Sequence, residues 1–92
     1  MALPGADLVS EGLKDLSLGR ETIAAFLVSI GEPRLRRLGL TLDRPLENPE
    51  ARLYRLLASD GSDSAHSRYN ALIRRLVSFE RAAELFVRNP LV

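Results

Sequence analysis

The chain has 92 residues, of which 46% are hydrophobic and 27% charged, and its formal net charge is +1. This length fits one domain with one hydrophobic core, and this composition excludes a chain that is disordered throughout. The small net charge argues against nucleic-acid binding driven by the field of the whole domain. Cysteine is absent, which excludes disulfides, thiolate metal sites and a cysteine nucleophile.

Leucine accounts for 18 residues, whereas tryptophan is absent. Such a core, with few aromatic and β-branched clusters, favours helices over sheets. The sequence predicts an all-α fold, a compact bundle of four main helices plus one short helix, with a long C-terminal amphipathic helix. We expect one domain over residues 1–92, with frayed tails at 1–6 and 89–92. Signal-peptide features and a span of ~20 apolar residues are missing, so we expect a cytoplasmic, bacterial-type protein without membrane contact.

The first helix is expected from Asp7 to Leu18, with Asp7 as its N-cap and Gly19 as its C-terminal cap. One apolar stripe with helical spacing runs along it, formed by Val9, Leu13 and Leu16. Glu11, Lys14 and Asp15 are expected on the opposite, exposed side.

The second helix, expected over residues 21–30, is apolar on almost every side, which is typical of a buried element. We expect it to be central, together with the last helix. Gly31 ends it, and a short third helix follows over residues 33–38. The segment 21–38 thus has the outline of a helix-turn-helix, although its second helix is short for reading a major groove. A generic helical corner is the other interpretation.

Residues 40–48 are expected to form a connection that Leu40, Leu42 and Leu46 tether to the core. Asn48 is placed to cap a fourth helix, which begins at Pro49 and ends near Ala58. Residues 59–63 carry the composition of a turn.

The strongest periodic signal belongs to a helix expected from Ser64 to Arg88. Its main apolar seam recurs in steps of three and four residues and comprises Tyr69, Leu72, Leu76, Phe79, Ala83 and Phe86. Ile73 and Val77 widen the apolar arc to roughly half the circumference, more than one packing neighbour requires. The second neighbour is either this chain itself or another molecule. The candidate interface is therefore Tyr69, Leu72, Ile73, Leu76, Val77, Phe79 and Phe86.

A polar cluster at the start of the same helix contains the single histidine. A helix N-terminus favours anions, because unpaired N–H groups and the helix dipole point there. The candidate anion or ligand site consists of His66, Arg68, Tyr69 and Asn70. The alternative is a capping arrangement, in which hydroxyl and amide side chains satisfy the local backbone.

Twelve of the thirteen cationic residues are arginine, which forms planar, bidentate contacts with carboxylates and phosphates. Codon usage in a GC-rich genome produces the same bias. The candidate nucleic-acid contacts are Arg34, Arg36, Arg37, Arg74 and Arg81. Glu80 and Glu84 interrupt this basic surface, and Glu84 precedes Arg88 by four residues, the favourable order for an intrahelical ion pair.

Catalysis has little support in the sequence. Two carboxylate pairs, Glu11/Asp15 and Glu80/Glu84, fall on faces predicted to be exposed, where burial does not raise a pKa for acid–base work. Metal-binding and phosphate-loop motifs are missing, so we expect neither enzymatic activity nor a cofactor. The leading hypothesis is a small intracellular helical protein-interaction module that acts by self-association, as a homodimer, or by docking a protein partner. The alternative is a nucleic-acid-binding helical protein that uses the arginine clusters and segment 21–38.

Overall fold

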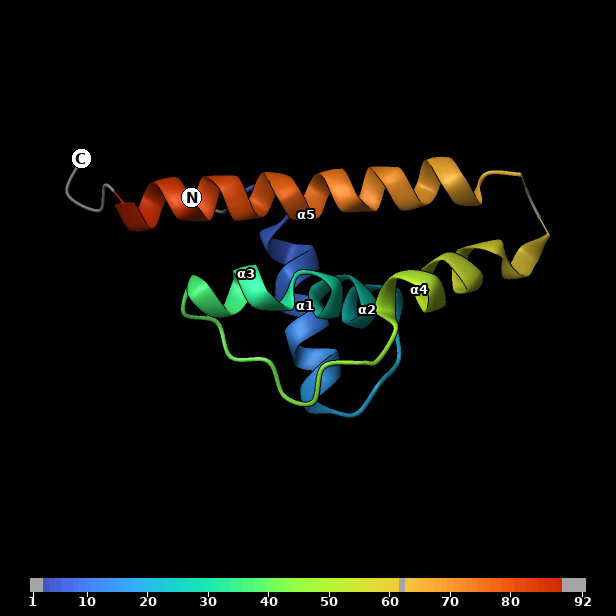
Figure 1. Ribbon diagram of the computed structural model, residues 1–92, viewed down its shortest axis with the longest axis horizontal. Coiled ribbons are helices and arrows are strands. Elements are labelled where there is room, and N and C mark those ends of the chain that lie inside the picture. Colours follow the sequence, from blue (N-terminus) through green and yellow to red (C-terminus); the bar gives the residue numbers. More distant parts are fainter. Residues whose placement is uncertain (1–2, 62, 89–92) are drawn as a thin grey trace.

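The computed structural model describes residues 3–61 and 63–88. Within these ranges the chain is all-α, which confirms the fold class expected from composition and periodicity (Figure 1). The elements in chain order are α1 (Ala6–Ser17), α2 (Ile23–Ile30), α3 (Glu32–Arg37), α4 (Pro49–Leu57), the 3-10 helix η1 (Ala58–Asp60) and α5 (Ala65–Arg88). None of these helices is both long enough and apolar enough to cross a membrane.

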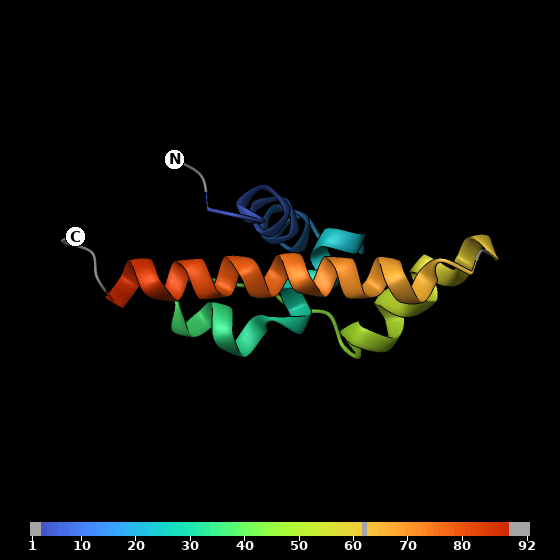
Figure 2. The ribbon, with the colours of Figure 1, turned by 90° about the horizontal axis from the view of Figure 1, so that it is seen from above.

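The long helix α5 lies along one side of the other helices as a layer of its own (Figure 1). Seen from that side, α1 lies on one flank of α5, and α3 and α4 lie on the other (Figure 2). With 24 residues α5 is about 36 Å long, and the longest dimension of the domain is 48 Å. The long amphipathic helix predicted from the periodicity is therefore present and runs along the long axis.

The helix α2 is the centre of the core, as its apolar sequence predicts. Its residues 24–29 are all buried. The polar member of this run is Ser29, whose hydroxyl donates to the carbonyl oxygen of Ala25 (2.8 Å) and accepts from the backbone N–H of Leu46 (3.0 Å). The second bond ties the connection between α3 and α4 to the core.

The expectation that the last helix is equally central is wrong. Its buried residues are Ala65, Leu76, Phe79, Glu80 and Ala83, a small part of the 24. The reason is that α5 packs on the other helices with one side only, so its outer side faces solvent (Figure 1).

The helix α1 crosses α2 at Gly12, where the two backbones come into direct contact. A Cβ atom at this position would overlap the carbonyl oxygen of Ala24 and would lie 2.7 Å from Cγ1 of Val28. Asp15, expected on the exposed side of α1, is buried instead, because its Oδ2 accepts a hydrogen bond of 2.6 Å from the hydroxyl of Thr22. A side-chain partner thus allows this carboxylate to leave water.

Several helix ends differ from the expected ones by one or two residues. Asp7 is not the N-cap of α1, because the helix begins at Ala6 after Gly5, which has a left-handed backbone (φ 73°). Asn48 also has a positive φ (47°) and makes no side-chain cap to α4. The backbone conformation, rather than a capping side chain, thus sets the start of α1 and the start of α4.

The second helix begins at Ile23 rather than at residue 21, because Thr22 caps it and accepts a hydrogen bond of 3.1 Å from the backbone N–H of Ala25. The third helix is shifted by one residue, to 32–37. After α4 the chain continues as η1 rather than directly as a turn.

The connection between α3 and α4 contains no strand, and its leucines hold it to the core as expected. Leu42 is buried, and Leu40 and Leu46 pack partly buried against the core cluster. Of the expected tails, residues 1–2 and 89–92 lie outside the described residues. Leu3 packs against the core and Ala6 opens α1.

Candidate functional site

The seven residues of the candidate interface occupy three kinds of environment. Leu76 and Phe79 are buried in the chain's own core. Tyr69, Leu72 and Ile73 are partly buried and pack against that core, and Val77 is partly exposed. Phe86, by contrast, is 66% exposed. Most of the wide apolar arc thus has a neighbour within the chain, and its C-terminal end does not.

The apolar seam of α5 extends further than the helices beneath it. Ala83 is the last buried residue of the seam. One turn later Leu85, Phe86 and Val87 are 60%, 66% and 57% exposed. Figure 1 shows the C-terminal end of α5 extending past α3. We refer to Leu85, Phe86 and Val87 as the apolar end of α5.

An open hollow of about 430 Å³ lies between α3 and the apolar end. It is lined by Arg34, Arg37, Leu38, Glu84, Val87 and Arg88. Leu38 and Val87 provide apolar surface, and the remaining residues are charged. Because the hollow is open and mostly charged, it offers a partner a shallow surface rather than an enclosed, apolar ligand cavity.

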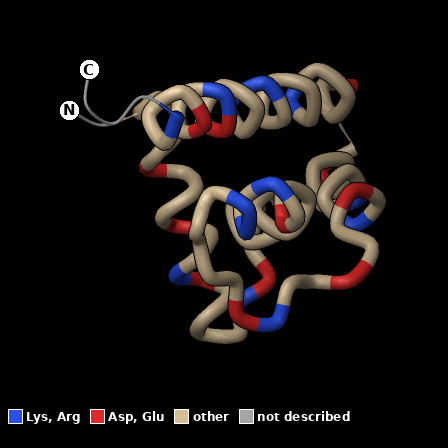
Figure 3. The backbone as a smooth tube through the Cα atoms, turned by 60° about the vertical axis from the view of Figure 1, so that its left-hand side comes forward, with Lys and Arg blue, Asp and Glu red and all other residues tan. Residues whose placement is uncertain are grey.

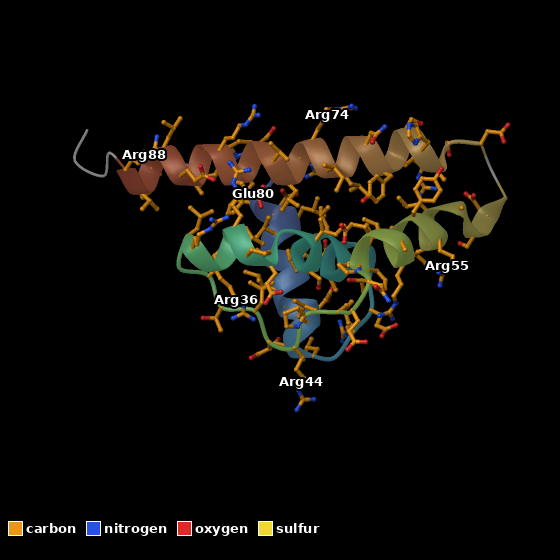
Figure 4. The ribbon with its side chains drawn as sticks, in the orientation of Figure 1. Arg36, Arg44, Arg55, Arg74, Glu80 and Arg88 are labelled. Carbon is orange, nitrogen blue, oxygen red and sulfur yellow. The ribbon has the colours of Figure 1, made fainter. Side chains whose placement is uncertain are left out.

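One side of this hollow is built by an ion-pair network that joins α3 to α5. Nη1 of Arg34 lies 3.4 Å from Oε1 of Glu80, and Nε of Arg34 donates to Oε1 of Glu84. Glu80 is only 4% exposed and points from α5 toward α3 (Figure 4). The hollow therefore has a charged wall that is fixed on both helices.

The same arginine has different effects on the two carboxyl groups. Burial raises the pKa of Glu80 above its ordinary value near 4.5, and the attraction of Arg34 opposes this only in part. The hydrogen bond from Arg34 lowers the pKa of Glu84, and the positive charges of Arg34, Arg88 and Arg37 lower it further. The prediction that Glu80 and Glu84 both lie on an exposed face is wrong for Glu80, because Arg34 provides a partner on the inner side.

The spacing of Glu80 already contained a signal for its position. It lies four residues after Leu76 and three before Ala83, so on a helical wheel it falls on the apolar seam. A carboxylate in such a seam requires a cationic partner, and Arg34 is 46 residues away in the sequence. Sequence reasoning therefore missed the pair.

The five candidate nucleic-acid contacts do not converge on one surface. Arg34 and Arg36 are in ion pairs, the latter with Glu32 at 2.7 Å. Arg36 lies below α3, whereas Arg74 points away from the other helices on the outer side of α5 (Figure 4). Arg37 and Arg81 are exposed. Basic and acidic residues are interspersed along the chain (Figure 3).

The residues of the candidate ligand site at the start of α5 also contact different neighbours. His66 and Asn70 face each other on the surface, with 3.2 Å between Nε2 and Nδ2. The hydroxyl of Ser67 donates to the carbonyl oxygen of Ser64 (3.1 Å). These contacts are local to the first turns of the helix.

The other two members of that site point to different neighbours. Arg68 forms an ion pair with Asp60 of η1 at 3.5 Å. Tyr69 packs against Tyr54 of α4, with 5.7 Å between the ring centroids, and burial raises its pKa above the ordinary value of 10.0. His66, Arg68, Tyr69 and Asn70 thus do not form a single pocket.

Among the described residues, no three His, Asp or Glu side chains come together as a metal-binding group. Comparisons with protein-family models, with curated proteins and with solved structures found no match to this chain.

Proposed function

We propose that this chain is a small helical protein-interaction module that docks a protein partner through the apolar end of α5 and the adjoining hollow. The observation that carries the proposal is the exposure of three consecutive large apolar side chains, Leu85, Phe86 and Val87. Successive residues of a helix point about 100° apart, so Val87 lines the hollow while Leu85 and Phe86 face other sides of the helix end. Single exposed apolar residues are ordinary on protein surfaces, whereas three of them around the end of one helix, beside a hollow, favour an interaction site.

Docking of a different protein has more support than self-association. A symmetric dimer that uses the apolar end would bring the same surface of two copies together. Arg81 and Arg88 flank the apolar end, so each copy would place positive charges against positive charges. Self-association remains the other form of the proposed function.

The nucleic-acid alternative has less support. Two of its five arginines are held in ion pairs, and Arg36 and Arg74 lie on different sides of the molecule. The helix α3, which would enter the groove, has six residues and places Arg34 against α5. Phosphate binding needs guanidinium groups that face one surface.

The proposal is tested by selecting a display library of random peptides on the intact chain. We expect enriched peptides whose binding is lost in the double variant Leu85→Ser/Phe86→Ser. The matched control is Leu18→Ser/Leu56→Ser, which removes two exposed leucines elsewhere, and it should bind as the wild type does. Failure to enrich any peptide, or binding that survives Leu85→Ser/Phe86→Ser, would contradict the proposal.

Sedimentation equilibrium separates the two forms of the function. We expect the mass of the monomer, 10.2 kDa, at micromolar concentration. A dimer that Leu85→Ser/Phe86→Ser dissociates would place the function in self-association instead.

A further inference from the structure

The chemistry of the partner follows from the charges around the apolar end, and this inference rests on the proposed function. We infer that the surface takes an acidic, amphipathic protein segment, with apolar side chains on Leu38 and Val87 and carboxylates at Arg37 and Arg88. No comparable hollow elsewhere on the described chain adjoins three exposed apolar residues in sequence.

Positive charge exceeds negative charge around the hollow and the apolar end. Four arginines surround the hollow and the apolar end, namely Arg34, Arg37, Arg81 and Arg88, and the two carboxylates among them are Glu80 and Glu84. This leaves an excess of two positive charges at neutral pH. A partner with negative charges is therefore favoured, and a basic one is disfavoured.

The excess positive charge lies on the arginines that have no carboxylate partner among the described residues. Arg34 is engaged by both carboxylates, so its charge is already compensated. Arg37, Arg81 and Arg88 form no ion pair within the described part of the chain, although Arg37 and Arg88 act electrostatically on Glu84. Their N–H groups remain available for charge-assisted hydrogen bonds with carboxylates of a partner.

Apolar side chains lie between those arginines. Arg81, Leu85 and Arg88 are spaced by four and three residues, so an apolar side chain lies between two arginines on one face of α5. In the hollow, Val87 and Leu38 lie among Arg34, Arg37 and Arg88. Leu85 and Val87 are two residues apart and face different sides of α5, and Arg88 lies between these two sides. Apolar side chains flanked by carboxylates complement each of them, which is the pattern of an acidic amphipathic segment.

A nucleic acid would satisfy the arginines but not the apolar end. Phosphate groups make no favourable contact with Leu85, Phe86 or Val87, and these side chains do not offer the stacking platform that exposed bases require, apart from the single ring of Phe86. A second copy of this chain would bring its own arginines to the contact. The acidic protein segment is the occupant that uses both features.

The test uses the peptides enriched on the intact chain. We expect their consensus to combine apolar residues with Asp or Glu, and we expect the best peptide to bind about tenfold more weakly to Arg37→Glu/Arg88→Glu, a fold-change typical of lost charge contacts at an interface. The milder Arg37→Gln/Arg88→Gln should show an intermediate loss. The matched control Arg55→Glu/Arg74→Glu makes the same change of charge at exposed arginines away from the hollow and should change the Kd less than twofold. Circular dichroism confirms that each variant is folded.

Three results would overturn the inference. The first is a consensus without acidic residues whose binding still requires Leu85 and Phe86, which would leave the proposed function standing. The second is an equal loss of peptide affinity in Arg37→Glu/Arg88→Glu and in the control Arg55→Glu/Arg74→Glu. The third is that a single-stranded oligonucleotide displaces the peptide and binds the wild type and Leu85→Ser/Phe86→Ser equally well. This result would assign the surface to nucleic acid.

Discussion

Nη1 of Arg34 lies 3.4 Å from Oε1 of Glu80, so a guanidinium that is partly open to solvent neutralises a carboxylate that is almost fully buried. The pair joins α3 to α5 at the edge of the proposed docking surface. Gly31 is part of the same contact, because a Cβ atom there would lie 2.9 Å from Oε2 of Glu80. The contact between α3 and α5 therefore includes the negative charge of Glu80, which burial disfavours. We expect the stability of the protein to depend on pH for this reason.

We predict that the free energy of unfolding falls as the pH rises from about 4.5 through the raised pKa of Glu80. The folded protein holds this proton more tightly than the unfolded chain does, so ionisation at Glu80 costs stability above that range. Glu80→Gln is expected to reduce the difference in stability between pH 5 and pH 7, as measured by urea denaturation. If the stability of Glu80→Gln changed between pH 5 and pH 7 as much as that of the wild type, ionisation of Glu80 would not destabilise the fold.

Glu84 provides the control, because the sign of its effect is opposite. Its pKa is lowered in the fold, so its contribution is present above the ordinary value near 4.5 and is lost as the pH falls through the lowered pKa. Glu84→Gln should therefore change the stability profile below pH 4.5, where Glu80→Gln has no comparable effect. It should also reduce the slope between pH 5 and pH 7 in part, because the negative charge of Glu84 is one of the causes that raise the pKa of Glu80.

We predict that Arg34→Ala destabilises the protein and that Glu80→Gln rescues part of the loss. Removal of the arginine leaves a buried carboxylate without a cation, which is more costly than losing both members of the pair. Thermal denaturation of the two single variants and of the double variant measures the coupling. Arg37→Ala is the matched control on the same helix, and an equal loss in both arginine variants would contradict the pairing.

We predict that Gly12→Ala lowers the free energy of unfolding, although alanine is the better helix former by about 1 kcal/mol. The added methyl group would meet the backbone of Ala24, which cannot move aside as a side chain can, and the expected cost is about 1–3 kcal/mol. Ser10→Ala, at an exposed position of the same helix, should be neutral or stabilising. A Gly12→Ala protein as stable as Ser10→Ala would exclude the close crossing of α1 and α2.

We predict that Leu53→Ala and Phe86→Ala differ strongly in their effect on stability. Leu53 is fully buried, so its truncation should cost about 2–5 kcal/mol. Phe86 is mostly exposed, so its truncation should change the free energy of unfolding by no more than about 0.5 kcal/mol. Urea denaturation of both variants tests this, and a large loss in Phe86→Ala would make the apolar end a part of the fold rather than a docking surface.

Much of the fold is predictable from the sequence, because burial follows the spacing of apolar residues. The all-round apolar character of residues 24–28 identified α2 as the core, and steps of three and four residues identified α5. The starts of α1 and α4 were less predictable. They depend on positive φ angles at Gly5 and Asn48, and a side chain suited to capping at Asp7 or Asn48 does not reveal that choice.

The candidate site was predictable only in part. The predicted seam includes Phe86, whose exposure depends on where α3 ends relative to α5, which is a tertiary relationship. The burial of Asp15 and Glu80 depends on Thr22 and Arg34, which neither periodicity nor composition pairs with them. Long-range partners of single polar residues are the information that one sequence lacks.

The hydroxyl of Ser29 gives the connection between α3 and α4 an unexpected property. The backbone N–H of Leu46 belongs to a segment without helix or strand, yet its acceptor is a buried side chain of the core helix. Amide hydrogen exchange at Leu46 should therefore be slow and should follow the opening of α2. Ser29→Ala should make this one amide exchange as fast as those of an ordinary loop, while the amides of α2 keep most of their protection. The exchange rate of this single loop amide therefore reports how often the core helix α2 opens.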